Sequence, residues 1–122
     1  MYKYALFCFC FSISFLFGEI RLLDSIQNVQ LKSSNKIVSS GKMEKQGVEY
    51  FIQNQNKVPV FISIRATDKE NIYDSFVPGQ FSIQPGKEEH VGWVLQNDPY
   101  ERADWGVDWN IEFGQPSEIS TP

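Results

Sequence analysis

Hydrophobic and polar residues alternate strictly along the last part of this chain. Between Trp105 and Phe113 every odd-numbered residue is apolar and every even-numbered residue is polar or glycine. Successive side chains of a β-strand point to opposite faces, so this pattern predicts a half-buried antiparallel strand. Shorter alternations predict further strands, with apolar side chains on one face at Val48, Tyr50 and Ile52, at Val58, Val60, Ile62, Ile64 and Ala66, at Phe81 and Ile83, and at Val91, Trp93 and Leu95.

Turn-forming residues separate these segments. Residues 54–57 read Asn-Gln-Asn-Lys, and residues 84–87 read Gln-Pro-Gly-Lys, in which Pro-Gly suits the centre of a type II turn. Pro59 lies early in its segment and indicates an edge position or a bulge there. Five or six short strands, with no helical period sustained after residue 30, predict an all-β fold: a single antiparallel immunoglobulin-like β-sandwich with its core in residues 48–114.

The segment 19–47 fits two interpretations. The apolar residues Leu22, Leu23, Ile26 and Val29 have the spacing of a short helix, while Val29 to Leu31 suit a strand equally well. Ile37 and Val38 suggest a brief edge strand between serine-rich stretches. Residues 115–122 are polar and are expected to form a flexible C-terminal tail.

The first 18 residues have the organisation of a secretory signal peptide. Lys3 gives a short basic start, residues 4–17 are uncharged and mostly apolar, and Gly18 is a small residue at which a peptidase can cut. Fourteen helical residues span about 21 Å, less than the roughly 30 Å of a bilayer core, so a spanning helix is disfavoured. We therefore expect export to the periplasm or the extracellular space, with no stable membrane span after cleavage.

Both cysteines, Cys8 and Cys10, lie inside this apolar run. Lipidation of either one is disfavoured, because a lipoprotein signal places its cysteine after the run, preceded by small residues. The exported protein is thus expected to contain no cysteine and to depend on packing for its stability.

Composition narrows the function classes. Hydrophobic residues make up 42% and charged residues 21% of the 122-residue chain, as in a globular domain. The formal net charge is -4, and it becomes -5 when Lys3 is removed with the signal. This charge argues against nucleic acid as a partner.

One resemblance emerges from the strand and turn pattern. The segments Phe51–Asn54, Val58–Val60, Asn71-Ile72, Pro78, Gln84–Gly86, Gln96–Pro99 and Trp105–Gly114 resemble a small β-sandwich region found ahead of the catalytic domain in some secreted zinc metallopeptidases of the lysostaphin type. The zinc-binding His/Asp motifs of the peptidase are absent from this sequence. The resemblance implies a stand-alone accessory sandwich of a bacterial cell envelope, without inherited catalysis.

Individual residues offer little catalytic or metal-binding chemistry. His90 is the only histidine, and with no cysteine outside the signal it makes a zinc site improbable, because zinc needs three or four ligands. The acidic loop Asp98–Asp108 suggests calcium, with Asp98, Glu101 and Asp104 as weak candidate ligands, or a pair of hydrolytic carboxylates. Solvated loop acids are the preferred interpretation, and no cofactor is expected.

Loop aromatics are the strongest functional candidates. Tyr73, Phe76 and Tyr100 lie outside the clear alternation, where they can form a platform for a sugar or a protein or can cover the end of the core. The leading hypothesis is a non-enzymatic, exported accessory or binding module of the bacterial envelope that recognises a protein or a glycan. The alternatives are a calcium-dependent or hydrolytic protein that uses the acidic loop, and a structural protein that polymerises through unpaired sheet edges.

Overall fold

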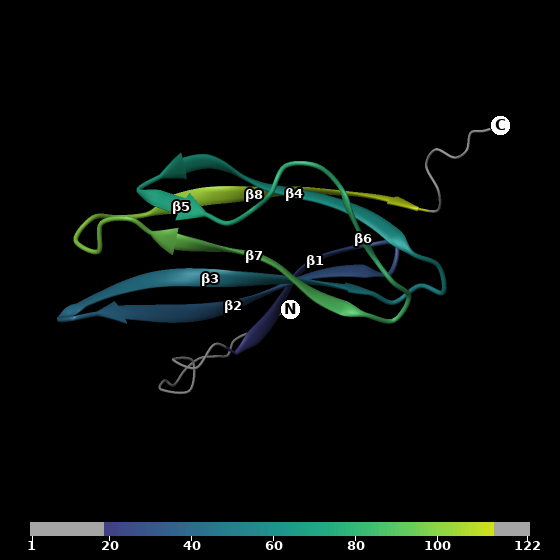
Figure 1. Ribbon diagram of the computed structural model, residues 1–122, viewed down its shortest axis with the longest axis horizontal. Helices are drawn as coiled ribbons and strands as arrows, with labels where there is room; N and C mark the ends of the chain where they lie inside the picture. The colour runs from purple at the N-terminus through teal and green to yellow at the C-terminus, as the bar shows by residue number, and fades with distance from the viewer. Residues whose placement is uncertain (1–18, 114–122) are drawn as a thin grey trace.

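The computed structural model describes residues 19–113, and this range folds into eight β-strands without a helix (Figure 1). The strands are β1 (Ile20–Ile26), β2 (Val29–Ser40), β3 (Met43–Asn54), β4 (Val60–Glu70), β5 (Ile72–Asp74), β6 (Phe81–Ile83), β7 (Glu88–Gln96) and β8 (Asp104–Phe113). The expected signal peptide and the expected tail lie outside the described residues.

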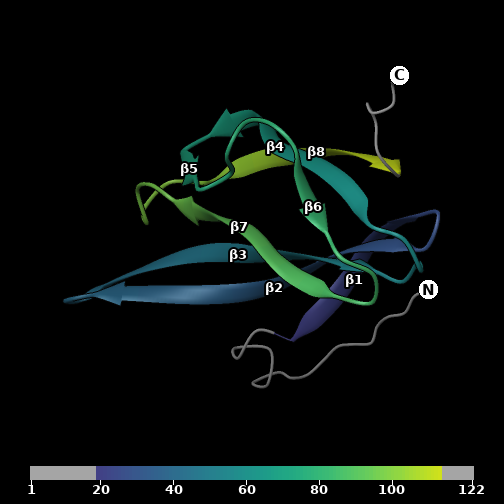
Figure 2. The same ribbon diagram turned by 45° about the vertical axis from the view of Figure 1, so that its right-hand side comes forward.

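Two antiparallel sheets pack face to face. The larger sheet has the strand order β1-β2-β3-β7-β5, and the smaller has the order β6-β4-β8. Figure 2 shows β4 and β8 lying across the layer formed by β2, β3 and β7. The all-β prediction with two antiparallel sheets is confirmed, and an immunoglobulin-like sandwich describes the arrangement.

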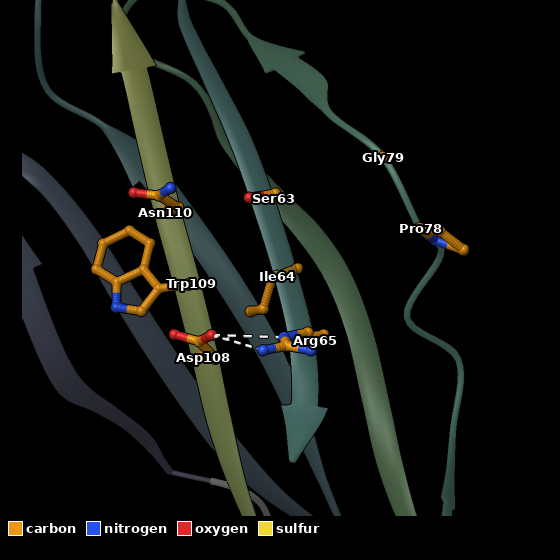
Figure 3. A pocket seen from close by; sticks show the side chains of 8 residues that line it. All are labelled: Ser63, Ile64, Arg65, Pro78, Gly79, Asp108, Trp109 and Asn110. Atoms are coloured by element: carbon orange, nitrogen blue, oxygen red, sulfur yellow. Dashed lines mark hydrogen bonds and ion pairs between the residues drawn. The ribbon is translucent and has the colours of Figure 1, made fainter.

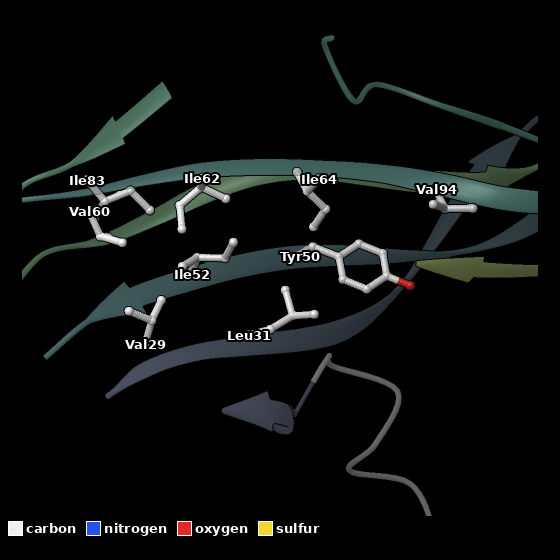
Figure 4. Close-up of a cluster of buried hydrophobic side chains, with 9 residues drawn as sticks. All are labelled: Val29, Leu31, Tyr50, Ile52, Val60, Ile62, Ile64, Ile83 and Val94. Carbon is white, nitrogen blue, oxygen red and sulfur yellow. The ribbon is translucent and has the colours of Figure 1, made fainter. Parts of the chain in front are cut away.

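The core fills the space between the two sheets (Figure 4). Its buried members are Val29, Leu31, Tyr50, Ile52, Val60, Ile62, Ile64, Ile83 and Val94. β3 and β4 contribute every second residue to this cluster, as the alternation predicts. Val58 is an exception, because it precedes β4 and is 47% exposed. Pro59 also precedes β4, so its missing N–H is not required by the ladder of that central strand.

The N-terminal segment forms strands and not a helix. Gln27 and Asn28 join β1 to β2 and have φ angles of 48° and 65°, as a two-residue type I′ turn requires. Gly41 begins the turn between β2 and β3 with a φ of 64°. Ile37 and Val38 belong to the twelve-residue β2, which pairs with β3 along its whole length but with β1 only as far as Ser34.

A β-bulge in β7 changes which of its side chains face the core. Tyr50 lies opposite Gly92 while Phe51 lies opposite His90, so one extra residue, Val91, sits between the two pairs. Gly92 is therefore on the core side, as is Val94, whereas Trp93 and the following Leu95 face outward. A single inward face for Val91, Trp93 and Leu95 is the wrong expectation, because the bulge interrupts the alternation.

β8 lies at an edge of the smaller sheet, and two of its side chains form hydrogen bonds to the larger sheet. Its residues Trp105, Val107, Trp109 and Ile111 all pack against the core, as predicted, although they are only half-buried. Phe113, at the end of the strand, remains 37% exposed. The indole Nε1 of Trp105 donates to the Tyr50 hydroxyl at 2.9 Å, and that of Trp109 donates to Asp24 Oδ2 at 2.9 Å. Each bond joins the two sheets.

Candidate functional site

A shallow depression lies on the outer face of the smaller sheet (Figure 3). Its volume is about 330 Å³, and it is lined by Ser63, Ile64, Arg65, Pro78, Gly79, Asp108, Trp109 and Asn110. Figure 3 shows Arg65 and Asp108 reaching toward each other, 3.3 Å apart, on neighbouring strands. Both side chains are exposed and already satisfy each other. This surface offers a solvated ion pair and few unpaired groups to a ligand.

A larger groove opens at the end of the sandwich where the β2–β3 hairpin extends past the smaller sheet. Both ribbon views show this hairpin as the farthest-reaching part of that end (Figures 1 and 2). The groove has a volume of about 660 Å³ and is lined by Asn35, Lys36, Ile37, Gln46, Gly47, Val48, Gln96, Arg102, Ala103 and Trp105. Ligand pockets of proteins typically occupy roughly 300–1,000 Å³.

The floor of the groove belongs to the inner face of the hairpin. Asn35 is paired with Val48, and Ile37 is paired with Gln46, so the four side chains lie on the same face as the core. Ile37, at this end, is 45% exposed. The fold thus leaves a strip of its own interior face open to solvent, with Ile37 and Val48 as its apolar side chains beside the amides of Asn35 and Gln46.

Trp105 forms part of the opposite wall. Its hydrogen bond to the Tyr50 hydroxyl fixes the orientation of the indole ring. Burial raises the pKa of Tyr50 above its ordinary value, an effect partly offset by this bond, so the hydroxyl is protonated at neutral pH. A rigid aromatic surface loses little conformational entropy when a ligand contacts it.

Polar groups border this strip. Within residues 19–113 the side-chain amides of Asn35 and Gln46 have no hydrogen-bond partner. Gln96, by contrast, is engaged: its Oε1 accepts from the Gln46 backbone N–H at 3.2 Å and its Nε2 donates to the Glu101 carbonyl at 2.8 Å. The exposed Arg102 guanidinium approaches Asp104 only at 3.5 Å. The groove therefore combines an apolar floor with free amides and a cation.

The aromatic residues expected to form a platform lie on different surfaces. Tyr73 is 42% exposed and contacts Trp93 edge-on, with ring centroids 5.6 Å apart, on the outer face of the larger sheet. Phe76 lies on the opposite, inner face, 5.6 Å from the Tyr50 ring. Tyr100 is 82% exposed on the loop after β7. Tyr73 and Phe76 thus do not share one surface, and a ligand-binding role for any of the three stays a prediction.

Two of the candidate metal ligands accept hydrogen bonds from backbone N–H groups close to them in the chain. Asp98 Oδ1 accepts from the Tyr100 backbone N–H at 2.9 Å, and Asp104 Oδ1 accepts from that of Trp105 at 3.0 Å. Across residues 19–113 no three acidic, histidine or cysteine side chains, Glu101 included, come close enough to hold a metal ion. Calcium binding by a cluster of these side chains therefore has no support in the described residues, while hydrolysis by a pair of carboxylates stays a prediction.

Asn71, which the sequence analysis named only as part of the resemblance, organises this loop. Its Nδ2 donates to the carbonyls of Asp98 and Glu101, and its Oδ1 accepts from the Asp98 N–H. A positive φ of 57° at Asn71 turns the chain between β4 and β5. Arg102 and Ala103, which line the groove, follow directly on this fixed loop.

His90 lies on the outer face of the larger sheet. Its ring meets Phe51 edge-on at 5.2 Å, and its Nε2 is 3.9 Å from Glu49 Oε2. Glu49 also pairs with Lys36 at 3.1 Å. The histidine lies beside this surface ion pair and not in the groove.

Comparisons with known proteins identify no family for this chain. No protein-family model, no curated protein and no solved structure matches it. The resemblance to the region ahead of lysostaphin-type peptidases therefore stays a prediction. In the described range there is no helix with the length and apolarity of a membrane span.

Proposed function

We propose that this protein is a non-enzymatic binding module, exported to the cell envelope, that recognises its partner through the groove at the open end of the sandwich. The observation that carries this proposal is the uncovered inner face of the β2–β3 hairpin, where Ile37 and Val48 lie opposite the fixed Trp105 ring. Soluble domains normally bury such surface, and an exposed apolar recess bordered by unpaired polar groups is typical of binding sites.

The chemistry of the groove supports binding more than catalysis. Its lining residues include no aspartate, glutamate, histidine, cysteine or serine, and its one lysine, Lys36, is paired with Glu49 at 3.1 Å. It does hold groups that bind and orient: a flat indole, two free amides and a guanidinium. These groups recognise the apolar faces and hydrogen-bonding edges of peptides or sugars.

Export forms the second part of the proposal and has a separate test. Residues 1–18 carry the signal pattern, and cleavage after Gly18 would leave Glu19, one residue ahead of β1, as the new N-terminus. Expression of the full chain in a bacterium, followed by fractionation and intact-mass measurement, is expected to give a periplasmic or secreted product that begins at Glu19. An uncleaved cytoplasmic product would contradict export without affecting the groove.

Binding is tested by presenting the purified protein to a glycan array and to a library of displayed random peptides. The Asn35→Ala/Gln46→Ala double variant removes the two free amides and is expected to weaken capture at least fivefold. Asn110→Ala, which alters the shallow depression on the other sheet, serves as the matched control and should bind like the wild type. Equal binding by all three proteins, or no binding to either library, would refute recognition at the groove.

A further inference from the structure

The groove adjoins an unpaired stretch of sheet edge. β1 covers β2 only from Val29 to Ser34, where Ile20 forms the last pair. From Asn35 to Ser40, β2 pairs with β3 on one side and, within residues 19–113, has no strand on the other. An open edge of this kind carries backbone N–H and C=O groups ready to pair with another strand.

The two hairpins establish which residues of β2 point their backbone groups to that edge. In a two-residue hairpin the residues flanking the turn exchange both backbone hydrogen bonds. Ser40 flanks the turn to β3, so even-numbered residues of β2 bond to β3. Val29 flanks the turn to β1, so odd-numbered residues bond toward β1. Both hairpins therefore agree that the odd-numbered residues of β2 direct their backbone groups away from β3. The N–H and C=O groups of Asn35, Ile37 and Ser39 consequently point to the open edge.

The same residues face the groove with their side chains. Odd-numbered side chains of β2 point to the inner face, as Val29 and Leu31 do in the core. Asn35 and Ile37 accordingly line the groove, and their backbone groups lie along its rim. A strand placed on this edge would make main-chain hydrogen bonds and, with every second side chain, reach the apolar strip between Ile37 and Trp105.

The other edges are less suited to this role. β5 and β6 are three residues long, too short to hold a partner strand firmly. β8 is longer, but its even-numbered side chains include Asp104, Asp108 and Glu112, and charged side chains on an edge discourage pairing. β1 is interrupted by a bulge at Leu23. The edge from Asn35 to Ser39 is regular and opens onto a recess.

We propose that the groove takes an extended peptide segment of a partner protein, which adds as a strand to β2 at residues 35–39. This inference rests on the proposed function and narrows its ligand from protein or glycan to a peptide read by strand addition. The segment needs about five residues, with apolar side chains at alternate positions facing the groove. Main-chain bonds to Asn35, Ile37 and Ser39 would hold it, and the floor of the groove would select its side chains.

Amide hydrogen exchange tests the geometry directly. The probe is a twelve-residue peptide selected from a displayed random library against the purified protein and then synthesised. In the free protein the amides of residues 35, 37 and 39 are expected to exchange at least tenfold faster than those of residues 36, 38 and 40. Saturation with the peptide should slow the odd-numbered set at least tenfold and leave the even-numbered set nearly unchanged. No protection at residues 35, 37 and 39 in the complex would overturn strand addition.

A matched pair of variants separates main-chain pairing from side-chain contact. Ile37→Ala and Ile37→Pro both lose the apolar side chain, but only the proline variant loses the outward N–H, which takes no part in pairing with β3. Peptide affinity is expected to be at least tenfold lower for the proline variant than for the alanine variant, at similar melting temperatures. Equal affinities would overturn the inference, and if the proline variant unfolds, the exchange experiment on the wild type decides.

The glycan array distinguishes this inference from the proposed function. Capture of glycans but not peptides, lost in Asn35→Ala/Gln46→Ala, would overturn strand addition and leave the binding module intact. Capture of neither would refute both. Peptides with alternating apolar residues that protect the odd-numbered amides would support both.

Discussion

Asn54 is a polar side chain that makes four hydrogen bonds inside the sandwich. It is fully buried at the end of β3. Its Nδ2 donates to the carbonyls of Val58 at 2.8 Å and Ile83 at 3.0 Å, while its Oδ1 accepts from the backbone and side-chain N–H groups of Asn56. One amide thus connects the loop before β4 with the end of β6.

The cost of replacing Asn54 with alanine can be worked out from these bonds. The buried Ile83 carbonyl loses a partner and cannot reach water, which costs about 1–3 kcal/mol. The other three bonds are part-buried and contribute roughly 0.5–1.5 kcal/mol each. We therefore expect Asn54→Ala to lower the free energy of unfolding by about 2.5–7.5 kcal/mol, a large share of the roughly 5–15 kcal/mol of a typical domain.

Urea unfolding followed by tryptophan fluorescence measures this loss. Asn56→Ala is the matched control: it removes two side-chain bonds, one of them exposed, and at roughly 0.5–1.5 kcal/mol for each bond it should cost about 1–3 kcal/mol, less than Asn54→Ala. Asn54→Asp keeps the shape of the side chain but directs an oxygen at two carbonyls, so we expect it to be at least as damaging as alanine at neutral pH. If Asn54→Ala costs less than about 1 kcal/mol, the reasoning from buried hydrogen bonds is refuted.

Four further outcomes test other parts of the structure. The bond between Trp109 and Asp24 should give a coupling energy of about 0.5–1.5 kcal/mol in a double-mutant cycle with phenylalanine and alanine, and a coupling near zero would show that it does not fasten the sheets. Gly92→Ala places a Cβ 2.6 Å from a phenyl ring and should destabilise the fold by about 1–3 kcal/mol, so an unchanged melting temperature would contradict the close approach. Because the pKa of Tyr50 is raised in the folded protein, its contribution to stability is present below the unfolded pKa of about 10 and is lost as pH rises through the higher folded value. Tyr50→Phe should therefore lose less stability at alkaline pH than the wild type does. Urea titrations at pH 9 and pH 11 would measure this difference. Millimolar calcium should leave the melting temperature unchanged, and a clear rise would restore calcium binding by the loop 98–108 as an alternative.

Local sequence patterns were sufficient where one strand has one buried face. The alternation from Trp105 predicts the inward side chains of β8 correctly, and the strand pairs regularly with β4 from Gly106 to Phe113. The Pro-Gly pair at 85–86 predicts its turn equally well: Lys87 N–H donates to the Gln84 carbonyl at 3.1 Å, and Gly86 has a φ of 75°.

Features that depend on pairing between distant residues were not predictable in this way. The bulge at Val91 exists only in relation to β3, so the sequence of β7 alone gives the wrong face for Trp93. The turn at Gln27 and Asn28 lacks glycine, and the segment around it therefore remained open between helix and strand. In the sequence Asn54 looks like an ordinary turn residue, because the carbonyl groups that it binds belong to other parts of the chain.

The groove could not be predicted from the sequence either, because it also depends on how distant segments are arranged. It results from a difference in length between the β2–β3 hairpin and the smaller sheet, and not from any motif. The feature that produces the groove is the pair of twelve-residue strands on either side of Gly41, because a hairpin of this length extends beyond the shorter strands of the smaller sheet. The aromatic residues chosen instead, Tyr73 and Phe76, were selected for being outside the alternation, and the fold directs them to opposite faces of the larger sheet.

The two indole bonds between the sheets also determine how the domain responds to its chemical surroundings. Both cysteines of the chain precede residue 19, so within the described range the layers are joined by hydrogen bonds and packing rather than by covalent links. Attachment of one layer to the other is therefore independent of thiol–disulfide balance. The connection between the two layers is therefore the same in a compartment that reduces disulfides and in one that forms them.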